Sequence, residues 1–491
     1  MSPTFSAIDP STLTLLEGEF ETTTPEELAT LATAARQAFL PYSRLTGAAR
    51  ARFLDAIAAG LEDEADVITE RAMAESGLPE GRIRGEVGRT SNQLRMFARL
   101  IESDSWTEPR IDHGDPARSP APKPDVRSMR RPLGPVAVFG ASNFPLAFSV
   151  AGGDTAAALA AGCPVIAKAH PSHPGTSKLV ADVILEAAHL TGMPHGVFGL
   201  VLEAGYEVGQ ALVRRPEVKA VGFTGSRAAG EALMRLAAAR PEPIPVYAEM
   251  GSVNPVFVTQ GALEARSESL AQGLFGSFTL GVGQFCTNPG VTLVPAGPAG
   301  DAFVARLAEL TAAADAGVML NSAVCERYGQ GLKELAAVGG REVARGAAAH
   351  GGAYGSPTLW EADVLAALAD PRLLSEVFGP STLVLRYRTQ GELEEFVAAI
   401  EGQLTATILG EDHEAIGLAP LAELLAERVG RVIFNQFPTG VEVGPAMVHG
   451  GPYPATSDGR STSVGTHAIE RFTRFVAYQN FPEELLPMAL H

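Results

Sequence analysis

This chain of 491 residues has few cysteines, no long apolar run and no excess of basic residues. Its 3 cysteines are an odd number without paired spacing, which excludes a disulfide framework and favours free thiols in a reducing compartment. No uninterrupted apolar run approaches the length of about 18 residues that a membrane helix needs, so we expect no membrane span. The 38 Lys and Arg against 56 Asp and Glu give a net charge of −18, which argues against a nucleic-acid partner.

Residues 1–10 lack the basic and apolar segments of a secretory signal, so we expect a cytoplasmic protein. His170 and His173 are close in sequence but have no cysteine or acid beside them, so no metal site is predicted. What the chain does contain is 46% hydrophobic residues, enough to build large cores over two or three domains.

The apolar spacing predicts an α/β fold. Helical periodicity runs through residues 25–40, 48–76 and 81–100, and short apolar strands alternate with helical segments between residues 136 and 258. Such alternation is typical of βαβ units with a largely parallel sheet. A second α/β region follows to about residue 443.

Two residues in separate segments have the chemistry of a nucleophile and a base. Cys286 lies in GVGQFCTN over residues 281–288, where the glycines allow a substrate to approach the thiol closely. Glu249 ends an apolar run, which predicts a position at the carboxyl end of a strand, where open α/β sheets place their chemistry. For a lone cysteine the alternative is a small buried hydrophobic residue.

Two turns add a donor and an anion site. Asn143 lies in FGASNFP over residues 139–145, directly after a short strand, and its amide can donate to an oxyanion or simply stabilise the turn. FTGSRAAG over residues 223–230 predicts a strand, a glycine turn and a helix start, with Gly225 and Ser226 suited to a phosphate. An ordinary serine N-cap is the equal alternative for Ser226.

Two further polar residues are candidates for binding a ligand. Lys168 ends the apolar run of residues 163–167 and can reach ribose hydroxyls or a phosphate. Glu376 precedes a Gly-Pro turn and can accept hydrogen bonds from a ribose, although alone it is typical of a surface turn.

These segments, in this order, resemble the aldehyde dehydrogenase superfamily over nearly the whole chain. The resemblance implies a Rossmann-type cofactor domain, a second α/β catalytic domain and a small β oligomerisation lobe. It implies that Cys286 attacks an aldehyde, that Asn143 and the Cys286 amide hold the oxyanion, and that Glu249 activates water to hydrolyse the thioester. It further implies cofactor-binding residues, which are Lys168, Ser172, Gly205, Gly225, Ser226, Glu376 and Phe378.

The tail narrows the resemblance to a subgroup. HGGPYPATSD over residues 449–458 and RSTSVGT over residues 460–466, with GGDT at 152–155 and AEMGSVNP at 248–255, look like the α-ketoglutaric semialdehyde (2,5-dioxovalerate) dehydrogenases. The subgroup implies oxidation of 2,5-dioxopentanoate to 2-oxoglutarate. Such a substrate carries a carboxylate, so its pocket needs a cation or hydroxyl donors, for which we expect Arg460, Ser461 and Ser463.

We predict a preference for NADP, with NAD also possible. No carboxylate stands in residues 169–172, directly after Lys168, to repel a 2′-phosphate. Glu207 on the next helix stands where an arginine would have strengthened this prediction.

The expected domains are residues 1–118 with 133–251 for the dinucleotide, residues 252–443 for the catalytic cysteine, and residues 119–132 with 466–491 for the oligomerisation lobe. By resemblance this lobe pairs subunits, so a homodimer or homotetramer is expected. Two alternatives stay open. One is a broad-range or long-chain fatty aldehyde dehydrogenase, and the other is a non-catalytic binding or structural protein on the same fold.

Overall fold

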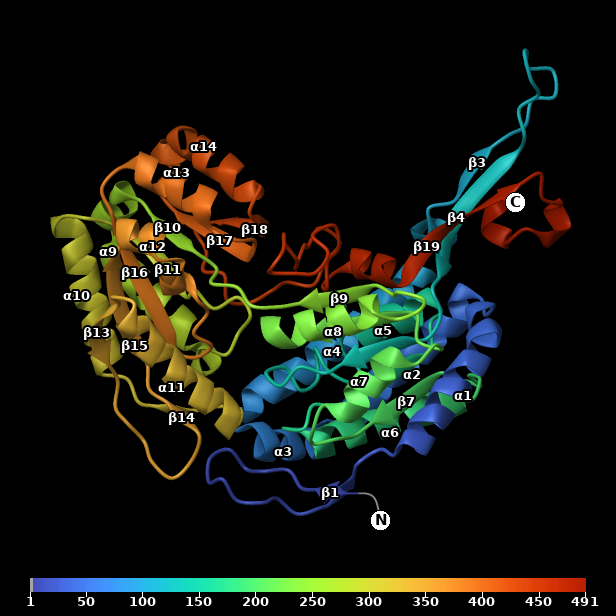
Figure 1. The fold of residues 1–491 in the computed structure, drawn as a ribbon, viewed down its shortest axis with the longest axis horizontal. Coiled ribbons are helices and arrows are strands. Elements are labelled where there is room, and N and C mark those ends of the chain that lie inside the picture. Colours follow the sequence, from blue (N-terminus) through green and yellow to red (C-terminus); the bar gives the residue numbers. More distant parts are fainter. Residues whose placement is uncertain (1–2) are drawn as a thin grey trace.

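The structure is a computed structural model and describes residues 3–491. It consists of two α/β domains that lie side by side and a β arm that projects from the first domain (Figure 1). The expected α/β class with largely parallel sheets is confirmed.

The first domain is built on a parallel sheet whose strands lie in the order β7-β6-β5-β8-β9. The strands are short apolar runs, because a sheet covered by helices on both faces buries both sets of side chains. Phe139 pairs with Lys168 on one side and with Phe223 on the other, and Thr224 pairs with Glu249. The polar residues that end these strands therefore share one edge of the sheet. The strands are β5 (Val136–Phe139), β6 (Val165–Lys168), β7 (Phe198–Val201), β8 (Ala220–Thr224) and β9 (Val246–Glu249).

Helices cover this sheet and form the N-terminal layer. The first begins at Thr24, whose hydroxyl accepts from the Glu27 amide while the Glu27 carboxylate accepts from the Thr24 amide. The helix expected over residues 48–76 is broken into two at Glu64. The helices are α1 (Pro25–Ser43), α2 (Gly47–Asp63), α3 (Ala65–Ser76), α4 (Glu80–Ile101), α5 (Gly153–Ala161), α6 (Pro174–Leu190), α7 (Glu207–Arg214) and α8 (Arg227–Ala238).

The second domain has a sheet in the order β13-β15-β16-β11-β10-β17-β18, parallel except for β13. Its core is aromatic, with Phe257, Phe278, Phe303 and Phe396 almost completely buried. The strands are β10 (Val256–Val258), β11 (Val291–Pro295), β13 (Arg341–Arg345), β15 (Thr358–Asp363), β16 (Ser381–Tyr387), β17 (Gln403–Leu409) and β18 (Val429–Phe434). The helices are α9 (Gln260–Thr279), α10 (Pro298–Ala312), α11 (Ser322–Ala337), α12 (Val364–Ala369), α13 (Gln390–Ala399) and α14 (Ala415–Ala426).

The arm is an antiparallel sheet in the order β19-β4-β3, made of β3 (Arg110–Asp112), β4 (Val126–Pro132) and β19 (Thr473–Gln479). The expected lobe began at residue 119, but β3 pairs with β4, so the arm includes residues that the sequence assigned to the first domain. Two small ladders join β1 (Thr4–Phe5) to β2 (Phe20–Glu21) and β12 (Gly317–Val318) to β14 (Tyr354–Gly355). The 3₁₀ turns are η1 (Asp104–Thr107), η2 (Leu280–Gly283), η3 (Pro371–Leu374), η4 (Asp412–Glu414), η5 (Thr466–Phe472), η6 (Glu483–Leu485) and η7 (Met488–Leu490).

After β18 the chain returns from the second domain to the first and lies along β9, as the red trace in Figure 1 shows. The Met250 amide donates to the carbonyl of Ala455 at 2.8 Å, and the Ala248 amide donates to Oγ of Ser457 at 2.8 Å. Farther on, Arg471 forms a buried ion pair of 2.7 Å with Asp154 of α5. Residues 444–465, which the sequence left outside every domain, therefore join the two domains at the end of β9.

Within residues 3–491, the structure contains no helix that is both long and apolar enough to cross a membrane.

Candidate active site

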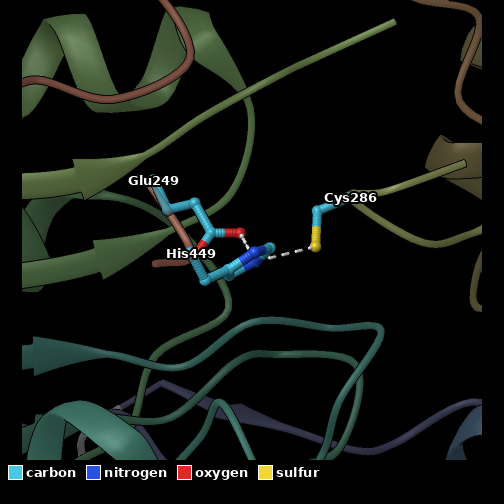
Figure 2. Close-up of side chains that lie close together, drawn as sticks. All are labelled: Glu249, Cys286 and His449. Atoms are coloured by element: carbon cyan, nitrogen blue, oxygen red, sulfur yellow. Dashed lines mark hydrogen bonds and ion pairs between the residues drawn. The ribbon is translucent and has the colours of Figure 1, made fainter. Parts of the chain in front are cut away.

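The candidate site lies where β9, the loop after η2 and the returning tail meet. Glu249 is the last residue of β9, Cys286 follows η2, and His449 belongs to the tail. Figure 2 shows the imidazole of His449 between the carboxylate of Glu249 and the thiol of Cys286. Three segments far apart in sequence thus bring a carboxylate, an imidazole and a thiol together.

The three groups contact one another through a single ring nitrogen. Nε2 of His449 is 3.4 Å from Sγ of Cys286 and 2.9 Å from Oε1 of Glu249. The other carboxylate oxygen of Glu249 accepts a hydrogen bond of 2.6 Å from the Ser463 hydroxyl. Since Glu249 and His449 are 2% and 1% exposed, bulk water does not screen this contact.

Burial and neighbouring charges set opposite protonation tendencies in this cluster. Burial raises the pKa of the Cys286 thiol well above its usual value, and the adjacent Glu249 carboxylate raises it further. Burial also acts to raise the pKa of Glu249, but His449 and the hydrogen bond from Ser463 outweigh it, so that pKa is lowered. The resting cluster therefore holds an ionised carboxylate beside a protonated thiol, and the thiol needs a base to become a nucleophile.

The backbone around the thiol is fixed by glycines and by one asparagine. Gly281 and Gly283 have φ of 55° and 65°, and a Cβ on Gly283 would collide with the carbonyl oxygen of Gly379. Nδ2 of Asn254 donates to the carbonyls of Cys286 at 2.8 Å and Asn288 at 2.9 Å. These contacts hold the cysteine loop against the segment that follows Glu249.

Asn143 lies next to this loop. Its Nδ2 donates to the carbonyl of Gln284 at 3.0 Å, two residues before Cys286, and its own carbonyl accepts from Arg82 at 3.3 Å. The structure thus brings Asn143 to the cysteine loop as the sequence predicted, while its oxyanion role stays a prediction.

His449 is the residue of this cluster to which the sequence assigned no role. The sequence HGGP marks a turn, and only the return of the tail to β9 brings its imidazole to Cys286. The donor atoms of Glu249, Cys286 and His449 lie within 4.8 Å of one another, a set that suits a zinc ion. Local spacing predicted no metal site because these donors come from distant segments.

Lys168 is the last residue of β6, on the same edge of the first sheet as Glu249, and it is largely buried. Its Nζ is 3.7 Å from the carboxylate of Glu203, which also accepts from the amides of Val208 at 2.8 Å and Gly209 at 2.7 Å. Burial lowers the pKa of Lys168, and Glu203 acts against that effect. Ser172, whose Oγ accepts from Asn321 at 2.9 Å, follows in the turn after β6.

Two turns at this edge expose backbone to an anionic ligand. Gly225 and Ser226 follow β8, and Ser226 caps α8 by accepting from the Ala229 amide at 3.4 Å. Gly205 precedes α7, where a Cβ would lie 2.5 Å from the carboxylate of Glu207. Free amides at a helix N-terminus suit a phosphate, so these turns fit a dinucleotide.

Glu376 and Phe378 line a pocket of the second domain with Ser252 and Gly283. One oxygen of Glu376 accepts from the Ser252 amide at 3.3 Å, and burial raises the pKa of this carboxyl to about 7. A carboxyl with one weak donor has free acceptor positions for the two hydroxyls of a ribose. The residues at this edge therefore fit the dinucleotide that the resemblance implies.

The expected substrate residues divide into two groups. The side chain of Arg460 is 90% exposed and pairs with Asp458, two residues before it, at 2.9 Å, while its role toward the substrate stays a prediction. Ser461 donates to the carbonyl of Asp458 at 3.1 Å, whereas Ser463 donates to the carboxylate of Glu249 at 2.6 Å.

Comparison with known proteins agrees with this geometry. The model of the aldehyde dehydrogenase family matches residues 1–477. The chain belongs to this family. Its Cys286, Glu249 and Asn143 therefore stand in the fold that the sequence motifs indicated.

Two bacterial enzymes are similar over most of their length. The chain is 51% identical to α-ketoglutaric semialdehyde dehydrogenase 2 of Azospirillum brasilense, over 93% of this chain and 87% of that enzyme. It is 47% identical to α-ketoglutaric semialdehyde dehydrogenase of Acinetobacter baylyi, over 96% of this chain and 90% of that enzyme.

The fold is also that of a solved structure, betaine aldehyde dehydrogenase of Staphylococcus aureus in complex with NAD⁺. The match has a TM-score of 0.83 at 22% identity and covers 98% of this chain and 92% of that chain. At 22% identity this similarity shows that the two chains share a fold.

Proposed function

We propose that this protein oxidises 2,5-dioxopentanoate to 2-oxoglutarate with NAD(P) as hydride acceptor. The observation that carries the aldehyde chemistry is the buried contact of Cys286 with His449 and Glu249. The substrate follows from the two α-ketoglutaric semialdehyde dehydrogenases that resemble the chain over most of their length.

The first step is attack of Cys286 on the aldehyde carbon. Because its thiol pKa is raised, the proton must leave to a neighbouring base. The tautomer of His449 that carries its hydrogen on Nδ1 leaves the lone pair of Nε2, 3.4 Å from Sγ, free to accept this proton. Protonated His449 then lies between the thiolate and the Glu249 carboxylate, and its positive charge stabilises both.

The adduct carries an oxyanion, for which Nδ2 of Asn143 and the Cys286 amide are the proposed donors. Nδ2 of Asn143 binds the Gln284 carbonyl in this structure, so it must turn toward the substrate. The chemistry that bound NAD(P) supplies is hydride acceptance, which leaves a thioester on Cys286. Lys168, Glu376 and the turn at Gly225 and Ser226 are the residues proposed to hold this cofactor.

Hydrolysis of the thioester needs a base beside Cys286. Glu249 has a lowered pKa, so it is ionised at neutral pH and can accept a proton from the attacking water. Ser463 fixes one oxygen of Glu249, which leaves the oxygen nearest His449 and Cys286 for the water. Covalent capture thus divides the oxidation into a hydride transfer and an acyl hydrolysis.

A preference for NADP over NAD stays part of the proposal. Residues 169–172 contain no carboxylate, which favours a 2′-phosphate near Lys168 and Ser172. Glu203, two residues after β7, acts in the other direction because its carboxylate is 3.7 Å from Nζ of Lys168. We therefore expect the Glu203→Gln substitution to raise the ratio of kcat/KM for NADP to that for NAD.

The arm supports assembly into a homodimer or homotetramer, since β3 and β19 are the outer strands of an exposed sheet that projects from the body (Figure 1). Free thiols on all 3 cysteines support a cytoplasmic location. Sedimentation of the purified protein tests the assembly.

The function is tested by NADPH and NADH formation with 2,5-dioxopentanoate, pentanal and a long-chain aldehyde. A higher kcat/KM for the keto acid than for both other aldehydes is the expected result. Equal or faster oxidation of the long-chain aldehyde contradicts the substrate, and absence of turnover on all three contradicts the enzyme.

A further inference from the structure

One wall of the site is a face of α4. Nη2 of Arg82 donates to the Asn143 carbonyl at 3.3 Å, and one turn later the Glu86 carboxylate accepts from the amides of Leu146 and Ala147, both at 2.9 Å. Residues three and four positions apart share one face of a helix, so Arg89 continues the same face. This face of α4 therefore lies against the turn that carries Asn143.

Arg82 contacts a carboxylate and two aromatic rings on this side of the site. Its guanidinium binds Glu86 at 3.3 Å and lies over the rings of Phe144 at 4.4 Å and Phe285 at 4.8 Å. Since Phe285 directly precedes Cys286, Arg82 ties α4 to the cysteine loop. Its charge is balanced by Glu86.

Arg89 is in the opposite situation. Its guanidinium lies 5.6 Å from the ring of Phe148, yet its Nε and Nη2 are buried without a hydrogen-bond partner among residues 3–491. The neighbouring carboxylate of Glu86 is already bound by Arg82 and by two backbone amides. Two buried N–H groups of a cation that have no acceptor are costly to a folded protein, so they indicate a place for an anion.

The location of Arg89 relates it to the reaction. Phe148, the ring beneath Arg89, is 6.3 Å from the imidazole of His449. Arg89 and His449 thus lie beside the same phenyl ring, and His449 contacts the thiol of Cys286 at 3.4 Å.

A second arginine, Arg431 of β18, has partners for two of its three guanidinium nitrogens. Its Nη1 donates to the Gly440 carbonyl at 3.1 Å and its Nη2 to the Pro438 carbonyl at 2.9 Å, which leaves Nε as its one nitrogen without a partner among residues 3–491. Arg89 has two such nitrogens, Nε and Nη2, and together they form the fork that matches a carboxylate.

We propose that Arg89 binds the carboxylate of the substrate and makes the enzyme selective for aldehydes that carry an acid group. This inference rests on the proposed function, because it gives the carboxylate of 2,5-dioxopentanoate its partner. It also replaces Arg460, which the sequence favoured and which binds Asp458 instead.

The test is selectivity of Arg89→Met, measured as the ratio of kcat/KM for 2,5-dioxopentanoate to kcat/KM for pentanal. We expect this ratio to fall about 10- to 150-fold, the range for loss of a hydrogen bond to a charged group, mainly through a higher KM for the keto acid. Arg89→Lys keeps the charge without the fork and should retain part of the selectivity. If Arg89→Met does not fold, the change in selectivity is measured with Arg89→Lys.

Two matched variants complete the experiment. Arg84→Met removes an arginine of the same helix that faces solvent and pairs with Glu80 and Asp66, and Arg460→Met removes the cation that the sequence favoured. Both should keep the wild-type ratio. An unchanged ratio in Arg89→Met and Arg89→Lys, or a loss in Arg460→Met alone, overturns the role of Arg89. A wild-type enzyme that prefers pentanal overturns the proposed function instead.

Discussion

Nε2 of His449 lies 3.4 Å from Sγ of Cys286 and closer still, at 2.9 Å, to Oε1 of Glu249. One imidazole nitrogen thus connects the residue proposed as nucleophile of the first chemical step with the residue proposed as base of the second. The following substitutions separate these roles.

Replacement of Cys286 by serine should abolish aldehyde oxidation and leave nucleotide binding intact, because a hydroxyl is a far weaker nucleophile at neutral pH. Steady-state NAD(P)H formation and cofactor titration by fluorescence measure the two properties. Cys325→Ser, at a half-buried thiol outside the cluster, is the matched control. Normal turnover by the Cys286 variant would refute its assignment as nucleophile.

Glu249→Gln should preserve a rapid first hydride transfer and slow the later hydrolysis about 100-fold or more, the usual contribution of a general base. Stopped-flow absorbance should then show a burst of about one NAD(P)H per subunit before a slow steady state. A variant without the burst would assign Glu249 to activation of the thiol through His449 rather than to hydrolysis.

His449→Phe should reduce the rate of the first hydride transfer about 100-fold or more, because the thiol loses the path for its proton. The pKa of Cys286 is raised by burial and by Glu249, and without the imidazole we expect it to be higher still. Alkylation by iodoacetamide across a pH series measures this shift. His467→Phe, at an exposed imidazole beside Glu470, is the control, and identical alkylation profiles for wild type and His449→Phe would contradict the proton path.

Glu376→Gln should stabilise the cofactor-free protein in alkaline but not in acidic solution. Burial raises the pKa of Glu376 from 4.5 to about 7, so the folded state binds this proton more tightly than the unfolded chain. Its contribution to stability therefore falls as pH rises from 4.5 to about 7. Thermal unfolding at pH 5 and pH 8 should show a gain in Tm for the variant only at pH 8. The same gain at both pH values would show that the carboxyl is not protonated in the fold.

Much of the fold follows from the sequence because it depends on local patterns. The apolar run that ends at Lys168 and the one that ends at Glu249 predicted strands, and parallel strands place their carboxyl ends on one edge whatever the details of packing. The helix expected over residues 48–76 was wrong at Glu64, where the chain turns between two helices that each keep apolar periodicity.

The site was less predictable wherever distant segments meet. His449 reaches Cys286 only because the tail pairs with β9, and Glu203 reaches Lys168 only across neighbouring strands. Arg460, which we expected to be the substrate cation, is exposed and pairs with Asp458 two residues away. Arg89 left no signal in the sequence, since its burial and unsatisfied donors appear only when α4 packs against the turn of Asn143.

The return of the tail to β9 also has a consequence for biosynthesis. Glu249 and Cys286 emerge from the ribosome long before His449 and Ser463, which complete their surroundings from near the end of the chain. All strands of the two large sheets precede residue 435, so a polypeptide that stops there contains these strands but lacks the imidazole and the hydroxyl of the cluster. The cluster is therefore complete only after residues 449–463 have been made.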